Sequence, residues 1–179
     1  INLFTGLSIG TNVLAANYFG AGKSRELKDT VHTSILLSII SGILLTGVGI
    51  VGSKYILILM QAPHEVLKLA TLYLRIYFAG ITSTMVYNFG SALLRAKGDT
   101  QRPLYILFLA GILNVILNLI FVICFKMGVA GVAWATVISQ TLSAILVIIL
   151  LVKEKDDFHL EFKKLKIKMP IFTNIVKIG

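Results

Sequence analysis

Apolar residues in this chain are gathered into five long runs that contain no Asp, Glu, Lys or Arg. The runs cover 1–22, 31–53, 76–94, 104–125 and 127–152. About 20 apolar residues, each adding about 1.5 Å to a helix, cross the hydrocarbon core of a bilayer. The apolar positions are continuous and do not alternate with polar ones, as the strands of a membrane barrel would. The pattern therefore predicts an all-α, polytopic transmembrane helix bundle.

The runs predict about five spanning helices and the start of a sixth. We place them at about 1–21, 30–53, 64–94, 102–125 and 128–152, with the sixth beginning near Pro170. The third is too long for a simple span, and its first part is amphipathic, which would put Arg75 near the hydrocarbon boundary. The chain starts without Met inside one apolar run, and the apolar segment that opens at Pro170 stops at Gly179. We therefore interpret the chain as part of a longer protein.

Charged connectors between the runs predict the orientation of the helices. The connectors 23–30, 95–102 and 153–169 carry twelve Lys and Arg residues, whereas the opposite connectors carry only Lys54, Lys68 and Lys126. Short loops rich in Lys and Arg stay in the cytoplasm. We therefore expect helices over 1–152, a basic cytoplasmic linker over 153–169 and the opening of the next transmembrane helix over 170–179, in a bacterial cytoplasmic membrane.

Composition agrees with a lipid partner and argues against a nucleic acid. The mean hydropathy is +0.88, 56% of the residues are hydrophobic and 14% are charged. Although the net charge is +9, the basic residues are confined to the gaps between apolar runs, which is typical of membrane topology. No span contains an acidic residue, and the sequence has no metal-ligand cluster, phosphate-binding loop or nucleophile motif. An enzyme is not expected, nor is a bound cofactor or metal.

Polar residues inside the spans are the candidate functional groups. Asn114 and Asn118 are four residues apart and hence share a helix face, and Thr136, Ser139 and Gln140 form a polar face on the next helix. Amides and hydroxyls are costly in hydrocarbon unless they have partners, so these faces should point into the bundle or line a wet cavity. Hydrogen bonding that only holds helices together is the alternative. The same alternative applies, more strongly, to Asn88.

Two cytoplasmic features carry structural expectations. In the linker, Phe158, Leu160 and Phe162 alternate with polar residues, a pattern that predicts a basic amphipathic segment lying along anionic headgroups. His32, at the cytoplasmic start of a helix, is expected to face water or headgroups. Lys97-Gly98-Asp99-Thr100 is typical of a tight turn, after which Pro103 fits a first helical turn.

Several motifs, in this order and spacing, resemble the N-terminal half of the MATE multidrug and toxic-compound exporters, over essentially the whole chain. They are Ala-Asn-Tyr-Phe-Gly-Ala-Gly (16–22), Ala-Pro-x-Glu (62–65), Tyr-Leu-Arg-Ile (73–76), Leu-Leu-Arg-Ala-Lys-Gly-Asp-Thr-Gln-Arg-Pro (93–103), Asn-x-x-x-Asn (114–118) and Gly-Val-Ala-Gly-Val-Ala-Trp-Ala-Thr-Val-Ile-Ser-Gln (128–140). The resemblance implies helices two to six of a twelve-helix, two-lobed transporter, joined to a second lobe of the same polypeptide.

The resemblance also implies a function and a site. Such transporters export drugs and organic cations by antiport against sodium or protons. Asn114, Asn118 and Thr136 would stand at the cation site, with Asn88 and Gln140 in the substrate cavity. Many relatives carry an aspartate where this chain has Asn118, and an amide can ligate sodium but cannot take up a proton near neutral pH. The coupling ion, Na⁺ or H⁺, therefore stays open.

Two other functions remain as alternatives. A flippase for a lipid-linked polysaccharide, from the same superfamily, would call for cations deep in a span to bind its anionic substrate, and the sequence shows none. A non-transporting membrane scaffold would need few polar groups facing inward, whereas amides lie in mid-span here. Both comparisons favour the exporter.

Overall fold

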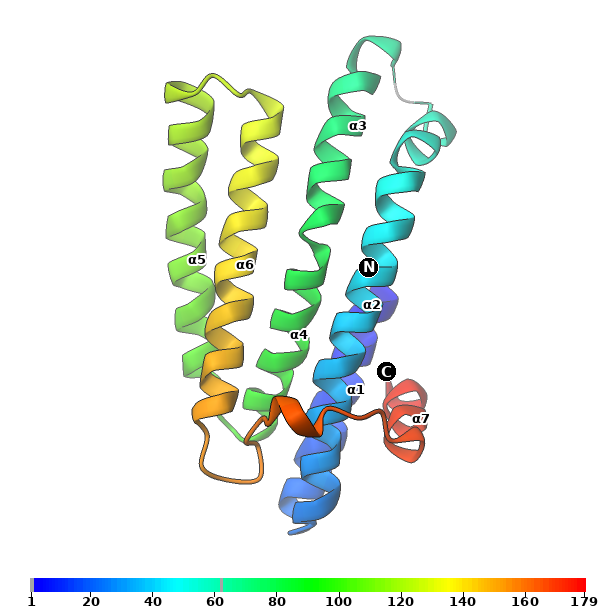
Figure 1. Ribbon diagram of the computed structural model, residues 1–179, viewed down its shortest axis with the longest axis vertical. Coiled ribbons are helices and arrows are strands. Elements are labelled where there is room, and N and C mark those ends of the chain that lie inside the picture. The colour runs from blue at the N-terminus through cyan, green and yellow to red at the C-terminus, as the bar shows by residue number, and fades with distance from the viewer. Residues whose placement is uncertain (1, 62) are drawn as a thin grey trace.

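The computed structural model describes residues 2–61 and 63–179, which form an elongated bundle of helices (Figure 1). The helices are α1 (Asn2–Gly20), α2 (Ser24–Leu59), α3 (His64–Ala79), α4 (Ile81–Ala96), α5 (Gln101–Leu119), α6 (Val129–Lys153) and α7 (Met169–Ile178). A π-helical turn (Ile120–Cys124) continues α5, and a short 3₁₀ turn (Phe162–Lys164) lies in the linker. The predicted all-α architecture is confirmed.

The long apolar helices have the dimensions of membrane spans. Among the described residues, α2, α5 with its π-helical turn, and α6 are each long and apolar enough to cross a bilayer, and α3 with α4 can form a fourth, bent span. The 19-residue α1 lies outside this set. Its role as a fifth span, and that of α7 as the opening of a sixth, stay predictions.

Helix α2 is longer than its apolar run. The prediction placed it at about 30–53, but it begins at Ser24 and ends at Leu59. The residues added at the start, 24–29, are mostly charged or polar, whereas those added at the end, 54–59, are mostly apolar after Lys54. Charged residues end an uncharged run without ending a helix. The breakers lie further out, at Gly22, which has a φ of +66°, and at Pro63. At about 1.5 Å per residue, this 36-residue helix is longer than the hydrocarbon core of a bilayer is thick.

The predicted continuous helix over 64–94 is wrong, because it is broken at Gly80. Helices α3 and α4 meet there at an angle of 43°. The backbone of Gly80 has an ordinary φ of −89°, so conformational freedom is not what requires glycine. Instead, a Cβ atom at Gly80 would lie 2.6 Å from Cγ2 of Val137 on α6. The bend lets α6 pack directly on the backbone of the broken helix.

Exchanging Gly80 for alanine is expected to destabilise the protein by about 1–3 kcal/mol, because a side chain is forced into a filled space. Val137→Ala should remove the obstruction, so the double variant should lose less stability than the two single variants added together. The measurement is thermal unfolding of the complete polypeptide in detergent. Gly47→Ala is the control, since a Cβ there meets nothing within 4 Å. Additive losses in the double variant would contradict the packing argument.

Helix α4 occupies the centre of the bundle, between α1, α2 and α6. Met85, Phe89 and Leu93 on α4 are fully buried. Two polar contacts hold its flanks: Asn12 on α1 donates from Nδ2 to the carbonyl of Ala92 at 2.8 Å, and the Tyr87 hydroxyl donates to the carbonyl of Pro103 at 2.9 Å. The hydroxyl bond fixes the start of α5 against α4.

The three basic connectors meet at one end of the bundle, as the charge pattern predicted. In Figure 1 the α1–α2 and α4–α5 turns and the segment after α6 all lie at the lower end. Ion pairs join these connectors: Lys97 binds Glu154 and Asp156, Arg102 binds Asp99 and, at 2.6 Å, Glu154, and Lys28 lies 3.3 Å from Asp157. By the excess of Lys and Arg, this end is the predicted cytoplasmic end.

The linker is attached to the helices, and only part of it is free to lie on headgroups. Phe158 and Leu160 are buried against the ends of the helices, whereas Phe162 is exposed. His32 does not face water, contrary to the expectation, because it is only 7% exposed. Its Nδ1 lies 2.7 Å from the carbonyl of Lys28, and its Nε2 accepts the backbone N–H of Glu161 at 3.1 Å.

Candidate functional site

Helices α5 and α6 form an antiparallel pair at one edge of the bundle (Figure 1). The π-helical turn begins two residues after Asn118. The connection to α6 then passes through Lys126 and Gly128, which have φ values of 53° and 55°. The turn and connection bring the polar faces of the two helices together. Turns of this π type occur often at functional sites.

Hydrogen bonds link the predicted cation-binding residues across the two helices. Nδ2 of Asn114 donates to Oγ1 of Thr136 at 3.4 Å and to Oγ of Ser139 at 3.3 Å. Nδ2 of Asn118 donates to Oδ1 of Asn114 at 3.0 Å. The spacings predicted the two polar faces, and only the family resemblance grouped residues from both helices into one site; the structure shows that the two faces meet. Ser139 is part of the same cluster.

The hydroxyl groups of the cluster present oxygen atoms and not protons. Thr136 donates its proton to the carbonyl of Val132 at 3.0 Å, and Ser139 donates to the carbonyl of Ala135 at 2.9 Å. Because each hydroxyl has one proton, only lone pairs remain for a partner from the other helix. Oδ1 of Asn118 is also buried and has no hydrogen-bond partner. An acceptor left in that state costs about 1–3 kcal/mol, so the site favours a donor or a cation.

A cleft of about 300 Å³ opens beside this cluster. Its lining includes Asn114, Thr136, Ser139 and Gln140, together with the apolar residues Leu107, Ala110 and Gly111. All of these side chains are uncharged. The cleft therefore offers amide and hydroxyl groups beside hydrocarbon, which suits a small cation or the polar part of an organic molecule.

The two residues predicted to line the substrate cavity are separated. Gln140 lies in the cleft with Asn114 and Thr136. Asn88 is half-buried on α4, outside that lining. A polar contact does join α4 to α6, between Oγ of Ser83 and Oγ1 of Thr141 at 3.1 Å, but it does not involve Asn88.

Larger hollows lie at the two ends of the bundle, and another of about 490 Å³ lies on an apolar face of α5. One of about 800 Å³ lies between the start of α2 and the linker, among charged side chains that are largely paired with each other. A second, of about 580 Å³, lies between α2 and α3 near the opposite end. Size alone therefore does not mark the site. The convergent polar groups of the α5–α6 cleft do, together with the unpartnered Oδ1 of Asn118, which lies in the same hydrogen-bonded cluster but outside the cleft lining.

Comparison with known proteins assigns the chain to a family. The MatE family model matches residues 1–120, more than half of the chain. The chain belongs to the MatE family. The MatE assignment confirms the resemblance that the sequence motifs indicated.

Relatives in the MatE family include bacterial proteins named for drug resistance. The probable multidrug resistance protein YpnP of Bacillus subtilis is 30% identical over 155 residues, which cover 87% of this chain and 35% of YpnP. A solved structure described as the inward-facing conformation of a multidrug resistance MATE family transporter of the MOP superfamily superposes with a TM-score of 0.91 at 27% identity, over 99% of this chain and 40% of that one. The outward-facing conformation of such a transporter gives a TM-score of 0.89 at 27% identity, over 98% and 39%.

This MatE chain therefore spans about 35% to 40% of the length of these relatives. With its apolar helices and bacterial relatives, it is a multi-pass protein of a bacterial membrane. The matching solved structure is described as a transporter, which supports a transporter family rather than an enzyme family.

Sequence reasoning placed Ser139 on the polar face but did not assign it to the cation site. The signal was its spacing of three residues from Thr136, which puts the two hydroxyls side by side on a helix. The unpartnered Oδ1 of Asn118 had no sequence signal, because it depends on how the side chains of two helices meet.

Proposed function

We propose that the protein carrying this chain is a secondary transporter that exports drugs or organic cations from bacteria by antiport against a cation, Na⁺ or H⁺. The names of the relatives support export of drugs. The proposed partners are the small-molecule substrate, the bilayer and a second lobe of the same polypeptide. The single observation that carries the cation coupling is the buried, unpartnered Oδ1 of Asn118 within a cluster of oxygen atoms.

Asn114, Asn118 and Thr136 are the proposed cation ligands. Amide and hydroxyl oxygens are ligands that hard cations accept, and transporters commonly bind Na⁺ with uncharged oxygens between helices. Ser139 adds a fourth oxygen to the set. Since the side chains of this cluster do not change protonation near neutral pH, the cluster by itself suits Na⁺ better than H⁺.

Gln140 and Asn88 are the proposed contacts of the exported compound. Gln140 shares the cleft with Asn114 and Thr136, so the compound and the cation would compete for neighbouring space. Competition of this kind is what antiport requires, because each ligand must favour a different arrangement of the lobes. Asn88 would meet the compound from α4, on the path between lobes.

Alternating access would come from rocking of this lobe against the second lobe around a central cavity. Near-equal TM-scores to an inward-facing and an outward-facing relative, 0.91 and 0.89, support a lobe that keeps its internal structure as the whole molecule changes state. The cation site lies inside the lobe, between α5 and α6, and the motion would change its access to water.

Transport by the complete polypeptide in proteoliposomes tests this function. With an organic cation dye inside and no gradient, efflux should be slow. An inward Na⁺ gradient should accelerate it several-fold, and a pH gradient alone should do less. Acceleration by the pH gradient alone would assign the coupling to protons and to residues outside this cluster. If neither gradient changed dye efflux, the antiport mechanism would be wrong.

A further inference from the structure

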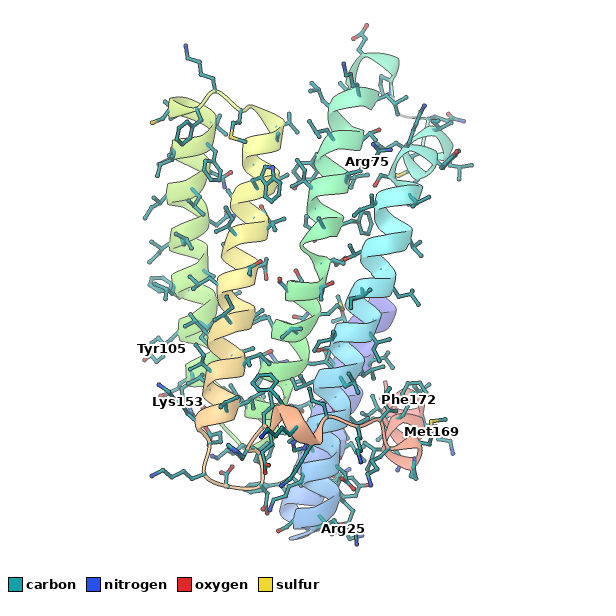
Figure 2. All side chains as sticks on the ribbon, in the orientation of Figure 1. Arg25, Arg75, Tyr105, Lys153, Met169 and Phe172 are labelled. Carbon is teal, nitrogen blue, oxygen red and sulfur yellow. The ribbon has the colours of Figure 1, made fainter. Side chains whose placement is uncertain are left out.

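Three cations surround the hollow between α2 and α3 near the outer end of the bundle. The hollow, about 580 Å³, is lined by Lys54 of α2, by Lys68 and Arg75 of α3, and by Thr71 and three leucines, Leu67, Leu69 and Leu72. Figure 2 shows Arg75 on the upper part of α3, at the opposite end of the molecule from Arg25. The charged groups lie on the side of the membrane away from the basic connectors.

The three cations have no carboxylate partner among the described residues. All the ion pairs of the described chain lie at the cytoplasmic end. Glu65 is the only acidic residue in the outer connectors, and it is not part of the lining. Lys54, Lys68 and Arg75 are exposed. The hollow therefore presents an uncompensated positive charge, which attracts an anion and repels an organic cation.

Geometry lets the cations act on one ligand. Lys68 and Arg75 are seven residues apart, which puts them on one face of α3 at a separation of about 10 Å along the axis. Both side chains are long, and Lys54 approaches from the neighbouring helix. An arginine guanidinium can bind a phosphate with two parallel hydrogen bonds, and lysine adds a flexible point charge.

The walls of the hollow select an amphiphile over a free ion. Leu69 and Leu72 are 51% and 44% exposed beside the cations. A hydrated anion gains nothing from such apolar surface, whereas acyl chains bury it. Arginine and lysine near the ends of membrane helices extend toward the headgroup layer, where phosphate groups of lipids are concentrated.

We propose that Lys54, Lys68 and Arg75 form a binding site for the headgroup phosphate of an anionic phospholipid, with its acyl chains along Leu69 and Leu72. The site is separate from the α5–α6 cleft and independent of the transport function proposed above. A bound lipid would join α2 to α3 at their outer ends.

Lipid binding to the purified complete polypeptide tests the site. The protein in neutral detergent is titrated with phosphatidylglycerol, and bound lipid is counted by native mass spectrometry. Lys68→Gln with Arg75→Gln should raise the phosphatidylglycerol concentration for half-saturation by about fivefold for each cation removed. The matched control is Lys126→Gln, an exposed outer cation outside the hollow, which should leave binding unchanged.

Two further arms identify the ligand. Inorganic phosphate at the same concentration should not displace the lipid, and Leu69→Ser with Leu72→Ser should weaken phosphatidylglycerol binding while all three cations remain. Thermal unfolding of each variant in detergent confirms that it is folded. Equal binding by the charge variant and the wild type, an equal loss with Lys126→Gln, or displacement by inorganic phosphate would each overturn the proposal.

Discussion

Replacing Asn114 and Asn118 together by alanine is expected to weaken cation-driven efflux strongly and leave the protein folded. The double change removes two amide oxygens from the proposed cation site, one of them buried without a partner. Loss of an oxygen partner costs about 1–3 kcal/mol, so two losses should raise the cation concentration for half-maximal efflux by on the order of 100-fold. The measurement is dye efflux from proteoliposomes at a series of Na⁺ concentrations.

Ser143→Ala is the matched control for this double variant. Ser143 is buried on the same helix as Ser139, and its hydroxyl donates only to the backbone of that residue at 3.2 Å. Efflux should depend on Na⁺ as in the wild type after this change. Unchanged coupled efflux in Asn114→Ala/Asn118→Ala would remove these residues from the cation site.

Asn118→Asp separates ligation from simple packing. A carboxylate of nearly the same shape should bind the cation more tightly when ionised. Tight binding should therefore be present while the new carboxyl is ionised and be lost at the lower pH where it takes up a proton. A purely packing role for Asn118 would give no such dependence on pH.

Glu154→Gln is expected to give the largest loss of stability at the cytoplasmic end. The Glu154 side chain is 8% exposed and pairs with both Lys97 and Arg102, whose side chains are 24% and 42% exposed. Breaking a buried pair costs about 3–5 kcal/mol. Because Arg102 is partly in water, the loss here should be about 1–3 kcal/mol, after allowance for screening. Thermal unfolding of the complete polypeptide in detergent measures it.

The pKa of Lys97 explains why Lys97 stays charged beside Glu154 and Asp156. Burial lowers the pKa of Lys97, but hydrogen bonds to Asp156 and Glu154 raise it more, so the pKa lies above its ordinary value. The stabilisation is full below the ordinary pKa of lysine and is lost only as the pH rises through the higher value in the folded protein. It is therefore constant across the physiological range.

Glu161→Gln is the comparison for Glu154→Gln. Glu161 pairs with Lys164 at 2.8 Å, but the two side chains are 42% and 65% exposed. The hydrogen bond from Lys164 lowers the pKa of Glu161, yet solvent screens the pair. Its removal should change the unfolding temperature much less, and an equal change in the two variants would show that the burial of Glu154 does not matter.

Most of the fold could be predicted from the sequence because spans are defined by composition. The predicted ranges for α1, α5 and α6 agree with the structure within a few residues, apart from the π-helical turn that closes α5. The breaks had no such signal. The bend at Gly80 is packed against Val137 of another helix. Glycine alone does not mark a break, because it is frequent in membrane helices in general. The burial of His32 could not be predicted either, because it depends on the linker folding back onto α2.

The candidate site could be predicted as far as its faces. Spacings of three and four residues placed Asn114 with Asn118 on one helix face, and Thr136 with Ser139 on another. The direction of each hydroxyl proton, and the buried oxygen that lacks a partner, result from the contact between α5 and α6 and could not be inferred from either helix alone. Asn88 shows the limit, because a polar residue at mid-span need not join the nearest polar cluster.

Hydrogen bonds between α2 and the linker limit how freely the two halves of the proposed transporter can move relative to each other. Thr33 donates to the carbonyl of Lys166 at 3.1 Å and accepts the N–H of Lys168 at 3.2 Å. The linker is therefore hydrogen-bonded to α2 close to its C-terminal end. Helix α7 follows directly and packs on α1 and α2 as well, with Ile171 and Ile175 buried. Rocking of the proposed second half would therefore pull on α1 and α2 through α7 as well as through the linker.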